Sequence, residues 1–338
     1  MGSWNKVRLE IEATKTQDGR VDLDGVRRAK IKKVSELTGR PLIIYASDFL
    51  NKPIPETAID FNDKEGFREV TQGLSAEGVD VLLHSPGGIA EAAESIVKLL
   101  RSRFKAVRFI VPNIAKSAAT MLALSGDEIL MDTDAELGPI DPQFNLRKAD
   151  GTTVVAPAQA IIDEFDRLES RIKGDPHVLP VYIPIIQIYA PSLYQQAKNA
   201  IDLSKKLVRE WLSNYMFSSM KPRDRSRRAA AIAKYLSDHN RFKSHSKGVR
   251  TEDFRKVGAL KRAKVVDLAT EPALQQEVQE LYAAISLTFQ VSSAFKLFEN
   301  SKDDALIRHV RQMQIQIPAG AQQIIGIERV QEAPVKPE

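Results

Sequence analysis

The stretch Val79-Asp-Val-Leu-Leu-His84-Ser-Pro-Gly-Gly-Ile89 decides the fold that this sequence predicts. Val79–Leu83 is apolar except for Asp80, which is typical of a strand covered on both faces. The apolar residues of Ile89–Leu100 recur at helical spacing, so a helix is expected directly after the turn. The pattern therefore predicts a buried strand, a turn with two glycines and a helix.

The same alternation continues on both sides of this unit. Further strands are expected at Pro41–Ala46, Val107–Val111 and Glu128–Met131, and further helices at Val26–Leu37, Phe67–Leu74 and Ala118–Ser125. Strands that alternate with helices need crossover connections, which produce a mainly parallel sheet. The predicted fold class is therefore α/β.

The second half of the chain is predicted to be mainly helical. Helices are expected at Ala156–Ile172, Leu193–Met220, Ala229–Leu236, Thr251–Val257 and Leu274–Phe298, with a proline-interrupted stretch at Asp175–Pro191 and a strand-like segment at Lys264–Leu268. The tail from Gln314 is expected to be partly disordered. This predicts a charged N-terminal extension over 1–40, an α/β domain over 41–270, and a C-terminal helix with its tail over 271–338.

Composition excludes several classes of function. The 338 residues contain no Cys, which rules out a disulfide framework, a thiol nucleophile and a Cys-ligated metal. A net charge of +5 is small for this length and does not indicate a nucleic-acid partner. We find no apolar run of about 18 residues and no signal peptide. We expect no integral membrane segment and a cytoplasmic location.

The adjacent glycines Gly87 and Gly88 are the first candidate for chemistry. They let the backbone approach a ligand closely and present N–H groups near a helix N-terminus, where an oxyanion can be stabilised. The alternative is a strand-to-helix turn that merely needs positive φ.

Ser117 is the second candidate, one strand–helix unit later. It follows strand Val107–Val111 among small residues, so its Oγ is expected at the carboxyl edge of the sheet, as in a nucleophile elbow. The N–H of Ala118 can point at the same oxyanion. The alternative is an ordinary N-cap serine.

Together these two units resemble the Clp-fold serine peptidases, which include the Clp proteolytic subunit and signal peptide peptidase A. The later Glu136-Leu-Gly-Pro-Ile-Asp-Pro-Gln143, Phe242–Val249 and Lys264–Leu268 are closer to one branch, the serine dehydrogenase proteinase (SDH) family. The resemblance covers roughly Leu42–Leu268. It implies a ClpP/crotonase-like spiral of βαβ units with a helical C-terminal region.

The resemblance also implies roles for single residues. Ser117 matches the nucleophile of a serine endopeptidase. Gly87 and Gly88 match the oxyanion-hole turn, and the N–H of Ala118 is the second donor. No cofactor and no metal are implied. The expected partners are a polypeptide substrate and further copies of the chain in a homo-oligomer.

The general base is where the sequence departs from the Clp proteolytic subunit, because Asp141 stands near the place of that relative's His. Signal peptide peptidase A and its kin use a Ser–Lys dyad, which needs a lysine whose pKa is lowered by burial. Lys198 is our preferred candidate. The alternative is a surface lysine paired with Asp202. His245 is the runner-up base.

Other charged residues are assigned lesser roles. Lys116 is expected to point away from the site, toward solvent or a carboxylate, and His84 is expected to be structural. His239 and His245 are expected to be too isolated from carboxylate partners to form a metal site. The basic cluster Lys221–Arg228 either binds an anionic partner or is a solvated helix approach.

Three functions follow from this sequence. The first is peptide-bond hydrolysis through an acyl-enzyme on Ser117, with a Lys base. The second is a catalytically silent scaffold that binds peptides or partner proteins through the same groove. The third, ranked last, is acyl-CoA chemistry on the related crotonase fold, which needs no serine.

Overall fold

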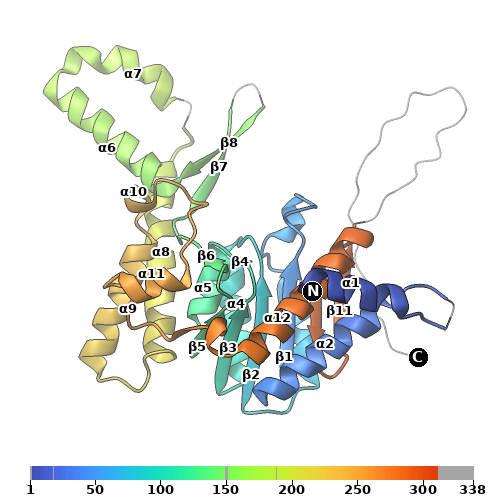
Figure 1. Cartoon of the computed structure of the whole chain (residues 1–338). Helices are drawn as coiled ribbons and strands as arrows, with labels where there is room; N and C mark the ends of the chain where they lie inside the picture. The colour runs from blue at the N-terminus through green and yellow to red at the C-terminus, as the bar shows by residue number, and fades with distance from the viewer. Residues whose placement is uncertain (1, 18, 149–150, 188, 311–338) are drawn as a thin grey trace, which may run out of the picture.

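A seven-stranded sheet forms the centre of the protein (Figure 1). The computed structural model describes residues 2–17, 19–148, 151–187 and 189–310. In spatial order the strands are β11 (Ala305–His309), β10 (Ala294–Asn300), β1 (Leu42–Ser47), β2 (Gly78–His84), β3 (Ala106–Val111), β5 (Glu128–Met131) and β9 (Val265–Asp267).

Five neighbouring strands, from β1 to β9, run parallel, as the alternation of strands and helices predicted. β10 pairs with β1 antiparallel, and β11 pairs with β10 antiparallel. The carboxyl ends of β1, β2 and β3 therefore meet at one edge of the sheet. The α/β prediction is confirmed.

Helices cover both faces of the sheet. Side chains on β1 alternate between them: Leu42 and Ile44 join the core beneath α2 (Leu23–Thr38) and α12 (Pro272–Val291), whereas Ile43 and Tyr45 join the core on the other face. That second core includes α3 (Asp63–Gln72), α4 (Ala90–Arg103) and α5 (Ala118–Leu124). α1 (Ser3–Ala13) packs on α12 through Val7 and Ile11.

The prediction of one helix over Leu274–Phe298 is wrong. α12 ends at Val291, and strand β10 follows after Ser292 and Ser293. β10 is buried along its whole length between β1 and β11, so its apolar residues reflect burial in a sheet and not one face of a helix. Beside the predicted domain boundaries at residues 40 and 270, helices α2 and α12 both pack on the central sheet. The tail from Gln314 lies outside the described residues.

An arm projects from this body (Figure 1). It consists of the hairpin β7 (Gln143–Arg147) and β8 (Thr153–Pro157) with helices α6 (Ala158–Gly174), α7 (Leu179–Ile186) and the start of α8 (Leu193–Asn214). The second half of α8 packs into the core through Leu207, Val208 and Trp211. Among the described helices, none combines the length and apolarity needed to cross a membrane.

Three helices follow the arm and lead back to β9. They are α9 (Pro222–Leu236), α10 (His239–Phe242) and α11 (Thr251–Lys256). α9 packs along α8, and Ala229, Ile232 and Ala233 are buried against it and the core. Two short strands, β4 (Ile114–Ala115) and β6 (Glu136–Leu137), pair in parallel beside the central sheet.

Candidate active site

The double glycine lies in the turn between β2 and α4, as the sequence predicts. Gly87 has φ +94° and Gly88 has φ +155°, in the region that favours glycine. A Cβ at residue 87 would lie 2.6 Å from Ser117 Cβ and 3.0 Å from the Ala118 nitrogen. The absence of a side chain at Gly87 therefore allows the two turns to touch.

Ser117 occupies the turn between β4 and α5. Its backbone has φ 52° and ψ −121°, which is strained for a residue that carries a Cβ and costs about 1–3 kcal/mol. Ala118 and Ala119, which follow Ser117 in the chain, are buried, and their packing contacts offset this cost. A sharp, strained strand-to-helix turn projects a serine hydroxyl away from the sheet. The side chain makes no helix-capping hydrogen bond, so it is not an N-cap in the usual sense.

Backbone hydrogen bonds hold the two turns in register. Ser85 N–H donates to Ile114 O at 3.0 Å, and Lys116 N–H donates to Ser85 O at 3.1 Å, forming a parallel bridge. Because the strands leading into the turns are joined in this way, Ser117 cannot move independently of the glycines.

A second bridge holds the outer side of the glycine turn. Ile59 N–H donates to Gly87 O at 2.7 Å, and Ile89 N–H donates to Ile59 O at 2.9 Å. The Gly87 N–H donates a hydrogen bond to Ser85 Oγ at 3.2 Å. Within the described ranges, the N–H groups of Gly88 and Ala118 have no hydrogen-bond acceptor. These two amides are therefore available to a ligand beside Ser117.

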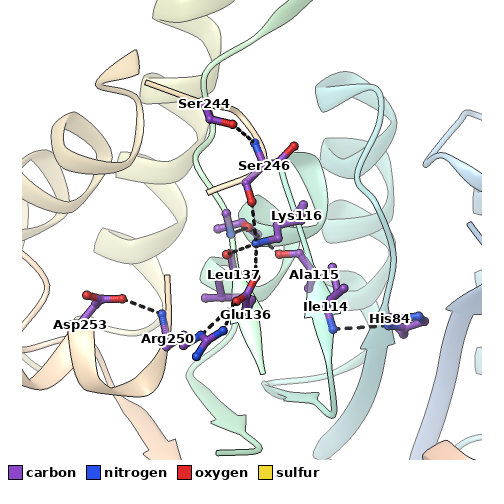
Figure 2. Close-up of polar contacts among 12 residues, drawn as sticks. His84, Ile114, Ala115, Lys116, Glu136, Leu137, Ser244, Ser246, Arg250 and Asp253 are labelled. Carbon is purple, nitrogen blue, oxygen red and sulfur yellow. Dashed lines mark hydrogen bonds and ion pairs between the residues drawn. The ribbon is translucent and has the colours of Figure 1, made fainter. Parts of the chain in front are cut away.

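Lys116 does not serve the hydroxyl of its neighbour. Its Nζ lies 2.8 Å from Glu136 Oε2 and donates to Leu137 O at 3.1 Å (Figure 2). Arg250 binds the other oxygen of Glu136 at 2.7 Å. Lys116, and then Arg250, hold the pKa of Glu136 below its ordinary value. Of the two partners expected for Lys116, solvent or a carboxylate, the structure shows the carboxylate of Glu136.

The segment after α10 passes close to Lys116. Lys116 Nζ lies 3.5 Å from Ser246 O (Figure 2), and Val249 pairs with Leu137 in an antiparallel bridge. Leu137 in turn belongs to β6, which pairs with β4 just before Ser117. These contacts hold the segment that contains the predicted runner-up base, His245, against Lys116, although His245 is 128 residues further along the chain than Ser117 (245 − 117).

His245 belongs to a polar cluster centred on Asp141. The carboxylate of Asp141 is buried, 2% exposed, and each of its oxygens binds a histidine: Oδ1 lies 2.8 Å from His245 Nδ1, and Oδ2 lies 2.8 Å from His239 Nδ1. Gln143 Nε2 also donates to Asp141 Oδ2 at 2.9 Å. The expectation that the two histidines lack a carboxylate is wrong, because the fold supplies one from a distant segment.

Nothing in the sequence spacing reveals this cluster. Asp141 is separated from His239 by 98 residues and from His245 by 104 residues. The available signal is that Asp141 lies within Glu136–Gln143, one of the segments that carry the family resemblance. In the part of the chain that the structure describes, no three His, Asp or Glu side chains are grouped as a metal site would need.

Lys198 does not have the environment that its predicted role requires. It is exposed on α8 in the arm, and its Nζ lies 4.2 Å from the centre of the Tyr194 ring. Tyr194, Asp166 and Asp202 raise its pKa, whereas a lysine base needs a lowered pKa. The described chain gives no contact between Lys198 and Ser117.

His84 is buried behind the site. Its ring packs 5.0 Å from Phe49 and 5.1 Å from Tyr282, and Ile114 N–H donates to its Nδ1 at 3.4 Å. Burial lowers the pKa of His84 to about 4, so the ring is neutral at pH 7. It supports β4 as a structural acceptor, which agrees with the expectation from the sequence.

Comparison with known proteins finds a match to a family model over most of the first half of the chain. Residues 26–171 match the model of the family described as ClpP-like SDH-type serine proteinase. The resemblance to SDH-type serine proteinases is confirmed. The matched segment contains Gly87, Gly88, Ser117 and Asp141, and it ends before Lys198 and His245.

Two similar proteins come from Methanocaldococcus jannaschii. The uncharacterized protein MJ1495 is 25% identical over 238 residues, which are 70% of this chain and 68% of that protein. The uncharacterized protein MJ0137 is 26% identical over 197 residues, 58% of each chain. Neither name states an activity.

Solved structures with similar folds include two proteases. An alanine variant of the 1510-N membrane-bound stomatin-specific protease, at 19% identity, covers 65% of this chain and 79% of its own, with a TM-score of 0.38. A second variant of that protease, bound to a substrate peptide, is 20% identical, covers 62% and 70%, and has a TM-score of 0.36. ClpP1 from Listeria monocytogenes is 10% identical, covers 71% and 95%, and has a TM-score of 0.36.

Proposed function

We propose that this protein is a serine endopeptidase that hydrolyses peptide bonds through an acyl-enzyme on Ser117. The observation that carries the proposal is the contact between the strained Ser117 turn and the Gly87–Gly88 turn. Backbone strain of about 1–3 kcal/mol is tolerated where a function requires the geometry. An N-cap serine needs neither the strain nor the adjacent glycines.

The unpartnered amides supply the second element of this chemistry. When the Ser117 oxygen attacks a carbonyl, the carbonyl oxygen becomes an oxyanion that must be held by preorganised donors. The N–H groups of Gly88 and Ala118 are suited to this role, since they have no acceptor within the described chain. Each such donor lowers the barrier by about 3–4 kcal/mol. Gly87 contributes its shape, because its own N–H binds Ser85.

We assign the general base to His245. Its Nδ1 is held by the buried carboxylate of Asp141, which leaves Nε2 as the nitrogen that accepts the Ser117 proton and returns it to the leaving amine. The negative charge of Asp141 stabilises the imidazolium that forms. The segment that carries His245 lies against Lys116, next to the nucleophile, which supports the assignment.

The Ser–Lys dyad with Lys198 is the competing assignment. It requires that Lys198 leave the Tyr194 ring and enter a buried site, for example from the arm of a second subunit. The homo-oligomer that we expect would permit this. Apolar side chains exposed on α7, among them Val181 at 69% and Ile183 at 41%, support association through the arm.

The substrate that fits this edge is an extended polypeptide. Ile59 pairs with the glycine turn as a strand would, so the turn is able to pair a second extended segment through Gly88. Specificity for the natural substrate then depends on the side chains that surround the bound substrate segment. The cytoplasmic location stays the prediction made from the sequence.

Labelling with a fluorophosphonate probe tests the proposal directly. The probe phosphonylates an activated serine, so mass spectrometry of the labelled protein should locate it on Ser117. Ser117→Ala should abolish both labelling and cleavage of an unfolded protein. Ser102→Ala, which removes an exposed serine of α4, is the matched control and should change neither. Labelling of Ser117→Ala at another serine would reject the assignment.

One observation favours a second function, the silent scaffold. No side chain in the described ranges makes a hydrogen bond to Ser117 Oγ. A scaffold would bind an unfolded polypeptide equally well as wild type and as the Ser117→Ala variant, and would turn over none. Stoichiometric probe labelling of Ser117 would exclude this alternative, because a serine without a base reacts slowly.

A further inference from the structure

A cavity lined by arginines lies away from the Ser117 site, between α9 and the segment that follows α11. Its volume is about 320 Å³, at the lower end of the range for small-molecule sites. Its lining residues are three arginines and five apolar or small residues: Arg227, Arg228, Arg262, Phe217, Ala231, Ile232, Gly258 and Ala259. The cavity contains part of the basic cluster 221–228, to which peptide hydrolysis gives no role.

Two of the arginines lack an anionic partner. Arg227 binds Asp224 at 3.1 Å, which compensates part of the local charge. Arg228 and Arg262, by contrast, make no ion pair with any residue that the structure describes. Two uncompensated guanidinium groups therefore face the same cavity. The alternative for the basic cluster, a helix approach whose charges are only solvated, does not account for two arginines that line one cavity.

The side chain of Arg228 carries the most specific evidence. Its Nε is buried and has no hydrogen-bond partner in the described structure. A buried donor without an acceptor is unfavourable, and native proteins leave few of them unless an ion, water or ligand completes the site. Arg228 lines the cavity together with Arg262, so an anion in the cavity would supply the charge partner that this guanidinium group lacks.

We propose that this cavity binds a small phosphomonoester, with its phosphate on Arg228 and Arg262. A phosphate group has three terminal oxygens and carries a charge of about −1.5 to −2 near pH 7. It can accept from two planar guanidinium groups at once, whereas a carboxylate has only two oxygens. The apolar wall of Phe217 and Ile232 accommodates the organic part of the ligand.

The cavity is separate from the peptidase site. None of the residues assigned to the Ser117 chemistry lines it. The ligand class is a phosphate group on a small organic body, and inorganic phosphate is the simplest member of that chemistry. Binding measurements on the full chain therefore test the proposal even in Ser117→Ala.

Isothermal titration calorimetry with three probes tests the site. Phenyl phosphate combines the phosphate with an apolar group and should bind tightest. Inorganic phosphate should bind more weakly, and benzoate, which lacks the phosphate, weakest. Arg228→Gln and Arg262→Gln should each weaken binding of phenyl phosphate about tenfold or more, as expected when one charge-assisted hydrogen bond is lost. Each variant should still melt cooperatively by circular dichroism.

Arg223→Gln is the matched control. Arg223 is an exposed arginine of the same helix that does not line the cavity, so its loss removes equal charge and should change the affinity less than about twofold. Equal weakening in Arg223→Gln and Arg228→Gln would overturn the proposal, because general charge attraction would then explain the binding. Absence of binding by folded wild-type protein at about 10 mM phenyl phosphate would also overturn it, since that bound excludes even weak specific affinity.

Discussion

Gly87 lies against Ser117 so closely that a Cβ at residue 87 would stand 2.6 Å from Ser117 Cβ and would also clash with the carbonyl oxygen of Lys116. These two residues lie on different strand–helix units, 30 positions apart in the chain (117 − 87). Their contact fixes the distance between the serine turn and the glycine turn. Any side chain at residue 87 must therefore separate the two halves of the proposed catalytic site.

Gly87→Ala should reduce activity strongly while the protein stays folded. The added methyl group meets backbone and must push the Ser117 turn away, and a displacement of about 1 Å in an active site costs about 100-fold in rate. The rate of fluorophosphonate labelling measures the effect. Gly39→Ala is the matched control, since Gly39 also has positive φ but nothing lies within 4 Å of its Cβ position. It should lower stability by about 1 kcal/mol and leave the labelling rate unchanged.

Asp141→Asn should lower the rate of peptide hydrolysis by about 10³–10⁴-fold, because the amide can neither fix the tautomer of His245 nor stabilise its imidazolium. His245→Gln should be equally damaging. His239→Gln is the matched control: it removes the other histidine on the same carboxylate and should retain most of the activity. Steady-state cleavage of an unfolded protein measures all three.

Lys198→Met distinguishes the two assignments of the base. With His245 as base, the variant should cleave at the wild-type rate, because Lys198 is exposed and contacts only Tyr194 on its own helix. Loss of activity in Lys198→Met, together with an active His245→Gln, would establish the Ser–Lys dyad and reject our assignment. Both outcomes leave Ser117 as the nucleophile.

The neutral His84 should make stability depend on pH. Burial lowers the pKa of His84 to about 4 in the folded state, against an ordinary value of 6.5. Between these values the unfolded chain binds a proton that the folded chain excludes, so the free energy of unfolding falls as the pH falls. The loss by pH 4 is about 3 kcal/mol. Above pH 7 this contribution does not vary.

Urea denaturation of wild type and His84→Gln at about pH 7.5 and 4.5, on either side of the ordinary histidine pKa, measures this contribution. Glutamine can accept from Ile114 N–H but does not titrate, so other titrating groups act equally in both proteins. The variant should therefore lose about 2–3 kcal/mol less than wild type over that interval. An equal loss in both proteins would show that His84 is protonated at no cost in the folded state.

Lys296→Met should destabilise the protein by about 3–5 kcal/mol, because it leaves the buried carboxylate of Asp63 with only the more distant Arg308, at 3.5 Å, as a cation. Lys296 and Asp63 are both fully buried, and their charged atoms lie 2.7 Å apart. Burial raises the pKa of Asp63, and Lys296 lowers it. The double variant Lys296→Met/Asp63→Asn should recover part of the loss, which a denaturation-based double-mutant cycle measures. Additive single effects would contradict this coupling.

The sequence predicts the parallel strands well because each is a short apolar run followed by a helical pattern. Val79–Leu83 and Val107–Val111 lie within strands β2 and β3. The sequence fails at Leu274–Phe298, because the break at Ser292–Ser293 contains neither glycine nor proline and the apolar pattern continues through it. Local pattern cannot distinguish a buried strand from a buried helix there.

The candidate site also has some parts that the sequence predicts and others that it does not. Ser117 and the two glycines are visible as local motifs, since each lies directly after a strand. The strain at Ser117 and the unused amides of Gly88 and Ala118 depend on contact between turns, which no local pattern encodes. The link between Asp141 and His245 depends on the return of the chain after α9 across β6. Lys198 has a suitable sequence position, but helix α8 carries it into the arm.

Strand β10 gives the proposed site a place in the order of protein synthesis. Lys296 on this strand donates to Ala58 O at 2.9 Å, and the next residue, Ile59, holds the glycine turn. A nascent chain that has emerged from the ribosome only as far as α12 therefore has Ser117 and Ile59 but lacks the Lys296 bond that holds the neighbouring Ala58. Translation must therefore pass β10 before the proposed site has all the contacts that hold its glycine turn.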